Sequence, residues 1–326
     1  MSRNPIVAVL HDGRVPDSVL MEPVSQAARV RYTESAGLVE ALDGTEVLFV
    51  YDFLTRSLPA AWHATTALKW LHMASTGVDP VLFPGARDSG VVVTNTRGVF
   101  DTPIAEYVLT QILCYAKDVT GSLERQRDGV WEHRDCERVA GARVVVVGTG
   151  SIGRATARLL RAVGMRVRGV GRAARADDPD FGAVDTDLHA AIAAVDYVVC
   201  VLPLTDATRN LFYARAFNAM PTHARFINVG RGETVVTDAL VAALRSGGIA
   251  GAALDVVDPE PLPPDHPLWY LSGVRITPHN SGDVAGWRAE LVAAFARNFA
   301  RWIRNEPLAD VVDMNLGYVP TVRGVR

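Results

Sequence analysis

Val144-Val145-Val146-Val147-Gly148-Thr149-Gly150-Ser151-Ile152-Gly153 is the stretch of this 326-residue chain that decides its fold. The four valines predict a buried strand, and the glycine-rich residues after them predict a tight turn that opens a helix. Gly148 permits the turn, Gly150 lets a phosphate approach the backbone, and Gly153 lets the helix pack close to the strand. A tight turn that binds nothing is the alternative. The strand–loop–helix context favours a dinucleotide whose pyrophosphate lies at the helix N-terminus.

The same alternation of apolar runs and helix-length segments continues on both sides of this loop. Short apolar runs bounded by turn residues are typical of buried parallel strands. They lie at residues 6–10, 46–50, 68–73, 91–94, 144–147, 165–170, 197–202, 225–229, 249–254 and 273–277. The segments between them are long enough for crossover helices, and residues 285–305 also have helical spacing. The sequence therefore predicts an α/β chain built on parallel sheets.

The chain is long enough for two domains with separate cores. We expect a discontinuous substrate-binding domain at residues 1–100 plus 286–326, because the last helix would return to the first domain. Residues 101–285 would form the dinucleotide-binding domain, since they contain the glycine loop. Hinges between the two domains are expected near 95–103 and 283–288.

A segment of different character begins the second domain. Residues 101–118 have the apolar spacing of a helix, with Pro103 near its start. The residues that follow, 121–139, are polar and have little periodicity. We interpret 121–139 as an extended arm that packs on a second copy of the chain. Residues 102–139 would then be a dimerisation element, and we predict a homodimer.

The composition excludes several classes of protein. The net charge of -3 and the scattered arginines give no reason to expect nucleic acid binding. Cys114, Cys136 and Cys200 are odd in number and unclustered, which argues against a disulfide framework and a cysteine-bound metal. We recognise neither a signal peptide nor an apolar run of membrane-spanning length. We therefore expect a cytoplasmic protein with no metal and no membrane contact.

The type of dinucleotide is predicted from the residues after the second strand of the glycine-loop unit. An NAD site usually has an acidic residue there, about 20 residues beyond the glycines, to bind the ribose hydroxyls. This chain has Val170-Gly171-Arg172-Ala173-Ala174-Arg175 instead, and its first carboxylate is Asp177. Guanidinium groups of Arg172 and Arg175 match the oxygens of a 2′-phosphate, although both could simply be surface arginines. We predict that NADP(H) is preferred and that NAD(H) is possible.

Three charged or titratable residues follow predicted strands of the same domain. Arg231, Asp255 and His279 come after the runs at 225–229, 249–254 and 273–277, and Glu260 lies in a proline-rich loop. Each residue alone is equally typical of a solvated turn or loop. Carboxyl ends of parallel strands meet at one edge of a sheet, however, where ligands bind. A cation, a carboxylate and an imidazole there are suited to holding an anion and moving a proton.

At this point the chain resembles the D-isomer-specific 2-hydroxyacid dehydrogenase family, and in particular its glyoxylate/hydroxypyruvate reductase-like, NADP-preferring branch. The matching residues follow the expected order and are spread over nearly the whole chain. They are Ser75-Thr76-Gly77-Val78-Asp79, Gly148 to Gly153, Pro203-Leu204-Thr205 with Thr208, Asn228-Val229-Gly230-Arg231-Gly232, Asp255-Val256 to Pro263, Pro267-Leu268-Trp269 and Thr277-Pro278-His279. The resemblance implies two Rossmann-like or flavodoxin-like doubly wound parallel-sheet domains, with an active-site cleft between them.

The resemblance also implies a reaction, the reversible reduction of a small 2-keto acid to a D-2-hydroxy acid. His279 would be the general acid/base, Glu260 would favour its charged ring, and Arg231 would bind the substrate carboxylate. The substrate would also contact His279 and the backbone of Thr76, Gly77 and Val78. The cofactor would contact a larger set of residues, with Asp255 at the nicotinamide amide. This set is Gly148, Thr149, Gly150, Ser151, Ile152, Gly153, Arg172, Arg175, Leu202, Pro203, Thr208, Val229, Gly230, Arg231, Asp255 and His279.

Two other functions stay open at this stage. A dinucleotide-sensing interaction protein is one, because the family includes a transcriptional corepressor that keeps the triad. A dehydrogenase for another small anion, such as formate or phosphite, is the second. Glu260 argues against formate, whose enzymes resemble this family but usually replace that glutamate. The sequence does not name the substrate.

Overall fold

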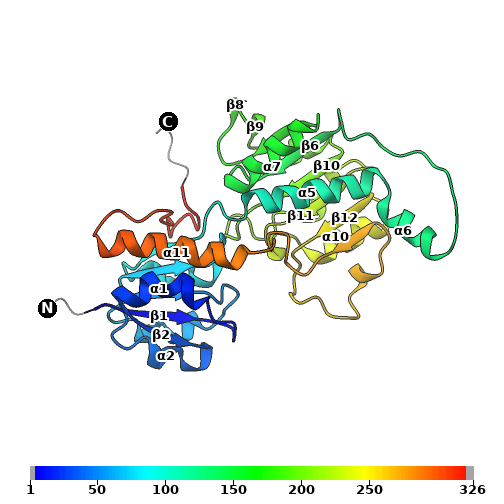
Figure 1. Cartoon of the computed structure of the whole chain (residues 1–326). Coiled ribbons are helices and arrows are strands. Elements are labelled where there is room, and N and C mark those ends of the chain that lie inside the picture. Colours follow the sequence, from blue (N-terminus) through cyan, green and yellow to red (C-terminus); the bar gives the residue numbers. More distant parts are fainter. Residues whose placement is uncertain (1–3, 321–326) are drawn as a thin grey trace. The chain divides into compact units, whose positions relative to one another are not determined.

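The computed structural model describes residues 4–320, which divide into two compact units (Figure 1). Unit 1 comprises Met1–Val99 and Ala285–Arg326, and unit 2 comprises Phe100–Val284. The expected boundaries, at 100/101 and 285/286, each differ from these by one residue. Both crossings between the units fall within the segments expected to be hinges. Among the described residues, none of the helices has the length and apolarity needed to cross a membrane.

Unit 1 contains a five-stranded parallel sheet in the order β2-β1-β3-β4-β5. The strands are β1 (Ile6–Leu10), β2 (Arg29–Thr33), β3 (Val47–Val50), β4 (Trp70–Met73) and β5 (Val92–Thr94). The helices are α1 (Ser18–Ala27), α2 (Leu38–Ala41), α3 (Leu58–Ala61), α4 (Pro84–Arg87) and α11 (Trp287–Ile303), with 3-10 turns at Ser35–Gly37, Trp62–Ala64 and Asp79–Val81. The strands other than β2 are nearly all buried, because helices cover both faces of the sheet.

The C-terminal helix α11 packs on the unit 1 sheet although about 190 residues separate it from β5. Its buried side chains include Leu291, Val292, Phe295 and Phe299. The ring of Phe295 stacks on that of Phe49 in β3, with centroids 4.1 Å apart. This packing explains why residues 285–326 belong with the first domain rather than with the second.

Unit 2 contains an eight-stranded sheet in the order β13-β12-β11-β10-β6-β7-β9-β8. The strands are β6 (Arg143–Val147), β7 (Arg166–Val170), β8 (Arg175–Asp178), β9 (Gly182–Asp185), β10 (Tyr197–Cys200), β11 (Arg225–Asn228), β12 (Gly251–Leu254) and β13 (Val274–Ile276). The helices are α5 (Asp101–Ala116), α6 (Val119–Arg127), α7 (Ser151–Ala162), α8 (Leu188–Ile192), α9 (Ala214–Ala219) and α10 (Thr237–Arg245), with 3-10 turns at Gly232–Thr234 and Pro267–Trp269.

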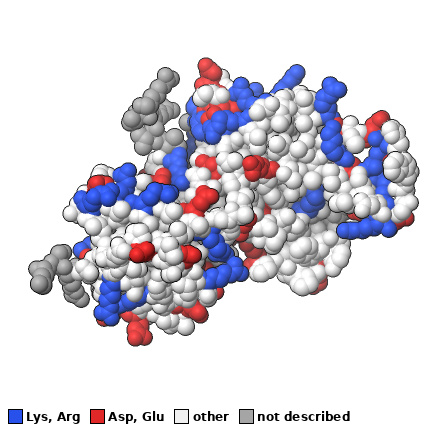
Figure 2. All heavy atoms as spheres, in the orientation of Figure 1, with Lys and Arg blue, Asp and Glu red and all other residues white. Residues whose placement is uncertain are grey.

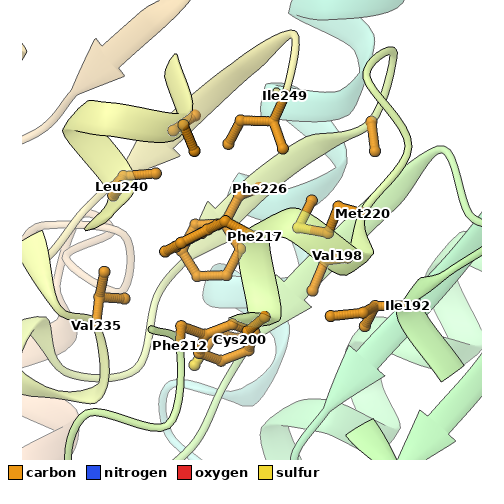
Figure 3. Packing of buried hydrophobic residues seen from close by; sticks show 14 of the residues in the cluster. Ile192, Val198, Cys200, Phe212, Phe217, Met220, Phe226, Val235, Leu240 and Ile249 are labelled. Carbon is orange, nitrogen blue, oxygen red and sulfur yellow. The ribbon is translucent and has the colours of Figure 1, made fainter. Parts of the chain in front are cut away.

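Helices cover both faces of the unit 2 sheet. Val145 and Val147 of β6 face a core that α8, α9 and α10 complete, and Figure 3 shows part of this core around Phe217 and Phe226. The alternate residue Val146 faces a second core, which α5 and α7 complete. The period of two along a strand thus produces two apolar faces from one run of valines. The predicted fold class, two doubly wound α/β domains, is confirmed.

Three strands were not predicted, and none of the three contains a long apolar run. β2 lies at the edge of its sheet and has the sequence Arg-Val-Arg-Tyr-Thr, so it contains no apolar run. β8 and β9 form an antiparallel pair at the far edge of the unit 2 sheet. The expectation of purely parallel sheets is therefore wrong for this pair. Edge strands need only one buried side, and hydrophobic periodicity gives little signal for them.

The expectation that residues 121–139 form an extended arm is wrong for the first part of the segment, because α6 continues to Arg127. Polar contacts stabilise this helix. Asp118 accepts a hydrogen bond from the Gly121 N–H and pairs with Arg125 and Arg134. Helix α6 has few apolar residues, so hydrophobic periodicity did not predict it. Residues 130–139 have no regular structure, and Trp131 among them is completely exposed.

Candidate active site and cofactor site

The loops after four neighbouring strands of unit 2, β6, β10, β11 and β12, contact one another in the order of the sheet. Val201, after β10, lies against the glycine loop, since a Cβ atom on Gly148 would be 2.9 Å from its Cγ2. A Cβ atom on Gly230, after β11, would be 2.6 Å from the Leu202 carbonyl oxygen. A Cβ atom on Gly232 would be 2.0 Å from the Val257 carbonyl oxygen, after β12. The carboxyl edge of this sheet is therefore one continuous, closely packed surface.

The predicted catalytic residues of unit 2 come together at this edge. The Nδ1 atom of His279 lies 2.7 Å from Oε1 of Glu260, and both side chains are partly exposed, at 26% and 34%. Burial alone raises the pKa of the Glu260 carboxyl, but the hydrogen bond and charge of His279 outweigh it. Arg231 acts in the same direction, and the net effect is a pKa below the ordinary 4.5. Glu260 is therefore a carboxylate at neutral pH, facing an imidazole.

Local backbone geometry turns His279 towards Glu260. Thr277-Pro278-His279 leaves the sheet directly after β13, and His279 has a left-handed backbone conformation with φ of 53°. Such a conformation costs a non-glycine residue about 1–3 kcal/mol and persists only where other contacts hold it. The N–H of His279 donates to the backbone oxygen of Asp255 at 2.9 Å. Strain at this position is typical of a functional side chain.

Asp255 lies at the same edge, but it is 98% buried and its carboxylate is already occupied by this chain. Its Oδ1 accepts hydrogen bonds from Thr277 Oγ1 at 2.6 Å and from the Asn280 N–H at 3.0 Å. Its Oδ2 accepts one from the Ser281 N–H at 3.0 Å. A carboxylate has about four lone-pair positions, so one is left for a ligand. Asp255 therefore stabilises the loop at residues 277–281, in addition to any contact with a cofactor.

The glycine loop fits a dinucleotide pyrophosphate. Gly148 has φ of 115°, which a side chain would strain, and a Cβ atom on Gly153 would be 2.0 Å from the Gly148 carbonyl oxygen. A Cβ atom on Gly150 would meet nothing within 4 Å among the described residues, so a ligand can approach there. Gly150 is also the N-cap of α7 and has no side chain to accept from the first N–H groups. These groups and the helix dipole are suited to phosphate.

The two arginines expected to select the cofactor lie in different surroundings. Arg172 is exposed in the turn after β7. Arg175 begins β8, where its Nε donates to Oδ2 of Asp178 at 2.7 Å. Its Nη2 is buried and has no hydrogen-bond partner among the described residues. Sequence reasoning missed this use of Arg175, because the unpredicted β8–β9 pair creates the contact.

The remaining cofactor residues of the prediction follow β10 and β11. Leu202 and Pro203 belong to the loop that packs against Gly230, and Val229 precedes this glycine at the end of β11. The Thr208 hydroxyl donates to the Pro203 carbonyl oxygen at 2.6 Å and accepts from the Thr205 N–H at 2.8 Å. Thr208 therefore shapes the loop itself.

Thr76, Gly77 and Val78 follow β4 in unit 1. The Thr76 carbonyl oxygen accepts a hydrogen bond from Asn95 Nδ2 at 2.6 Å, and the Gly77 carbonyl oxygen accepts one from Ser75 Oγ at 2.5 Å. Both carbonyl groups thus have hydrogen-bond partners within unit 1. The Oγ1 atom of Thr76 is buried and has no partner among residues 4–320. These two hydrogen bonds constrain the backbone of this strand-end loop.

The fold and the unit 2 site define a class of protein, the oxidoreductases that bind a nicotinamide dinucleotide. A family model described as "D-isomer specific 2-hydroxyacid dehydrogenase, NAD binding domain" matches residues 109–281, more than half of the chain. The chain belongs to the D-isomer specific 2-hydroxyacid dehydrogenase family, and the predicted family is confirmed.

Relatives from several organisms are similar over most of the chain. A glyoxylate reductase of Thermofilum pendens is 32% identical over 255 residues, which are 74% of this chain and 74% of that protein. A D-isomer specific 2-hydroxyacid dehydrogenase of Xanthobacter autotrophicus, solved with NADPH and MES, has a TM-score of 0.82 at 29% identity. The alignment covers 97% of this chain and 100% of that one.

A third relative is an NADPH-dependent glyoxylate/hydroxypyruvate reductase of Sinorhizobium meliloti, solved with NADP and sulfate. It has a TM-score of 0.81 at 27% identity, and the alignment covers 97% of this chain and 100% of that one. These similarities extend over both units of the chain.

Proposed function

We propose that this protein reduces a small 2-keto acid to a D-2-hydroxy acid, reversibly, with NADPH as the preferred cofactor. The observation that carries the proposal is the 2.7 Å hydrogen bond between His279 and Glu260, next to Arg231 and on the sheet edge that holds the glycine loop. The names of the glyoxylate and hydroxypyruvate reductases among the relatives support the same substrate class.

His279 supplies the proton. Its Nδ1 is bonded to Glu260, so Nε2 is the ring nitrogen that faces the substrate. When bound, the reduced nicotinamide supplies the hydride that goes to the carbonyl carbon. The proton of Nε2 goes to the carbonyl oxygen, which becomes the hydroxyl group. The carboxylate of Glu260 stabilises the imidazolium before the transfer, and the reverse reaction uses the neutral ring as the base.

Arg231 holds the substrate carboxylate. Its guanidinium forms charge-assisted hydrogen bonds to carboxylate oxygens and also polarises the neighbouring carbonyl group. Its Nη1 donates to the Gly230 carbonyl oxygen at 2.8 Å, which limits the positions that the side chain can take. We assign a second set of donors to the backbone N–H groups of Thr76, Gly77 and Val78, whose carbonyl groups at 76 and 77 are bonded within unit 1.

NADPH is preferred because Arg172, and to a smaller extent Arg175, would face the 2′-phosphate. The preference is supported by the cofactors in the Xanthobacter autotrophicus and Sinorhizobium meliloti structures. The pyrophosphate binds at residues 148–153, and the loops containing Leu202, Pro203, Thr208, Val229 and Gly230 surround the rest of the cofactor. Asp255 has one lone-pair position left for the nicotinamide amide. NADH would bind at the same loop with lower affinity.

A second copy of the chain is the expected partner, with α5, α6 and the arm at 130–139 as the contact. The complete exposure of Trp131 and the 52% exposure of Val130 support this proposal, since an exposed apolar arm is stabilised by burial against a partner. Light scattering of the purified protein should give twice the monomer mass. A monomer mass at micromolar concentration would contradict the homodimer.

One experiment tests the proposed function. Oxidation of NADPH is followed with a panel of 2-keto acids that includes glyoxylate, hydroxypyruvate and an aryl pyruvate, with NADH in parallel. We expect turnover of at least one acid and a higher kcat/KM with NADPH. His279→Ala should lower kcat by about 10²–10⁴-fold, the usual contribution of a general acid, and should still bind NADPH. Retained turnover in this variant, or cofactor binding without turnover of any acid, would overturn the proposal.

A further inference from the structure

Three residues from separate elements form a continuous series of hydrogen bonds next to the segment that contains His279. The hydroxyl of Tyr107, on α5, lies 2.6 Å from Oγ1 of Thr277, which follows β13. Thr277 Oγ1 in turn lies 2.6 Å from Oδ1 of Asp255, which follows β12. The sequence alone indicates no role for Tyr107 or for the Thr277 hydroxyl. These hydrogen bonds connect helix α5, on one face of the sheet, to the edge where the proposed catalytic residues lie.

The direction of these hydrogen bonds is fixed by the protons available. The Asp255 carboxylate can only accept, so the single hydroxyl proton of Thr277 goes to Asp255. Tyr107 must then be the donor to Thr277. Burial raises the pKa of Tyr107 to about 12, which keeps its phenol protonated at neutral pH. The arrangement therefore has one polarity, from Tyr107 through Thr277 to Asp255.

Asp255, which Thr277 holds in place, forms hydrogen bonds with the segment that contains His279. Its two carboxylate oxygens accept from the N–H groups of Asn280 and Ser281, and its backbone oxygen accepts from the N–H of His279. These three bonds hold His279 in its left-handed conformation, with φ of 53°. A change of a few tens of degrees there would swing the imidazole away from Glu260. The orientation of the ring thus depends on Asp255 being fixed.

We propose that Tyr107, Thr277 and Asp255 are positioning residues, which act on the reaction by holding His279 against Glu260. The proposal rests on the proposed function, in which His279 is the general acid. The hydroxyl of Tyr107 fixes Thr277, the hydroxyl of Thr277 fixes Asp255, and Asp255 fixes the backbone at 279–281. Asp255 therefore has a role that does not require contact with the cofactor.

Matched variants separate this role from simple stabilisation. Tyr107→Phe removes the first donor, Thr277→Val removes the middle hydroxyl, and Thr277→Ser keeps that hydroxyl. Tyr115→Phe is the control, because Tyr115 lies two turns further along α5 and donates to the Gly273 carbonyl oxygen at 2.9 Å. The control removes a tyrosine hydroxyl that bonds to the segment before β13 and has no link to Asp255 among the hydrogen bonds of the described residues.

The kinetic readout is kcat for reduction of the best keto acid. We expect kcat to fall about 5–10-fold in Tyr107→Phe, the effect of one hydrogen bond. Thr277→Val should lower kcat by about 10–100-fold, because a misplaced catalytic group costs up to about 10²-fold. KM for NADPH should change less than kcat, since the glycine loop that would bind the pyrophosphate is untouched. Thr277→Ser and Tyr115→Phe should keep kcat within about threefold of the wild type.

A second readout does not depend on turnover. The proton shared by His279 Nδ1 and Glu260 gives a downfield proton NMR resonance, assigned by its loss in Glu260→Gln and His279→Ala. We expect this resonance to persist in Thr277→Ser and Tyr115→Phe and to be lost or broadened in Tyr107→Phe and Thr277→Val. Unchanged kcat and resonance in folded Tyr107→Phe would overturn the proposal. If no acid is reduced by the wild type, the proposed function fails, and the resonance alone decides whether the three residues position His279.

Discussion

Arg154 on α7 and Asp178 at the end of β8 form a two-point ion pair, with Nη1–Oδ1 and Nη2–Oδ2 distances of 3.1 Å. Asp178 is 98% buried and accepts further hydrogen bonds from Arg175 Nε and from the N–H groups of Asp180 and Phe181. The pair connects the helix that opens at the glycine loop to the strand that carries Arg175. On the face in Figure 2, acidic and basic side chains lie scattered among one another.

Replacement of Asp178 by asparagine should destabilise the protein. The variant leaves Arg175 without its anion and Arg154 with Asp180 alone. Breaking a buried ion pair costs about 3–5 kcal/mol of unfolding free energy. The measurement is urea unfolding of both proteins at pH 7. Asp185→Asn is the matched control, since Asp185 pairs with Arg168 in the same sheet but is 35% exposed. The control should cost about 0–1 kcal/mol.

The stability difference between wild type and Asp178→Asn should depend on pH in a defined way. Burial alone raises the pKa of Asp178, but the bonds from Arg154 and Arg175 outweigh it and hold the pKa well below 3.8. A lowered pKa contributes stability that is complete above the ordinary value and is lost as the pH falls towards the folded-state value. The difference should therefore be constant from pH 8 to 5. A decline above pH 5 would contradict the ion pair.

Replacement of the two candidate phosphate-binding arginines should raise KM for NADPH to different extents. Arg172→Ala should raise KM for NADPH about 10–100-fold, the value of a charge-assisted hydrogen bond, and leave KM for NADH unchanged. Arg175→Ala should raise KM for NADPH less, because its Nε is bound to Asp178 and its Nη2 is buried. Steady-state kinetics of both variants, with NADPH and with NADH, measure these KM values. A larger effect of Arg175→Ala would assign the 2′-phosphate to Arg175 instead.

The buried His72 of β4 should make the stability of unit 1 depend on pH. Burial lowers the pKa of His72 to about 3, and its Nδ1 lies 2.7 Å from the Thr94 hydroxyl. Between that value and the ordinary 6.5, the unfolded chain binds a proton that the folded chain does not. Stability should therefore fall with pH below 6.5, by about 1.4 kcal/mol per pH unit from this residue. Unfolding of wild type and His72→Gln from pH 7 to 5 measures it, and parallel slopes would contradict the assignment.

Buried elements were predictable from the sequence, and the polar edges were not. The valine run of β6 and the other apolar runs gave strands within a few residues of the observed bounds, because both faces of these strands are buried. β2 and β8 lie at sheet edges, β9 lies next to β8, and all three have polar residues on at least one side. Their pairing depends on tertiary contacts, for which a local pattern gives no signal.

In the candidate site, too, some residues were predictable from the sequence and others were not. Arg231, Asp255 and His279 were predictable because each follows a strand and the strand ends of a parallel sheet meet at one edge. The role of Glu260 was implied by the family resemblance. Tyr107 was not, because its contact with Thr277 spans 170 residues of sequence. The engagement of Arg175 by Asp178 was also missed, since it depends on the β8–β9 pair. Composition and spacing indicate which groups are present, whereas such long-range contacts require the structure.

Glu260→Gln should change the pH dependence of reduction. The variant keeps a hydrogen-bonding side chain but removes the charge that stabilises the imidazolium of His279. We expect kcat to fall about 10–100-fold at neutral pH, within the range of acid–base contributions, and the ratio of wild type to variant to grow from pH 5 to 8. Glu260 itself stays ionised over this range, because its pKa lies below 4.5. Glu260→Asp keeps the charge, so its ratio should not vary with pH. A constant ratio for Glu260→Gln would show that the carboxylate does not act through the ring.

Two glycines of the cofactor loop provide a test in which the space around each residue predicts different effects on stability. Gly150→Ala should unfold like the wild type, since its φ is -76° and the added Cβ meets nothing within 4 Å among the described residues. It should nevertheless raise KM for NADPH about tenfold or more, because the methyl group occupies the space that the pyrophosphate needs. Gly153→Ala should lower stability and cofactor affinity together, since its Cβ would lie 2.0 Å from the Gly148 carbonyl oxygen. Thermal unfolding and NADPH titration of both variants measure these effects. An unchanged NADPH affinity in folded Gly150→Ala would mean that the phosphates do not bind at this loop.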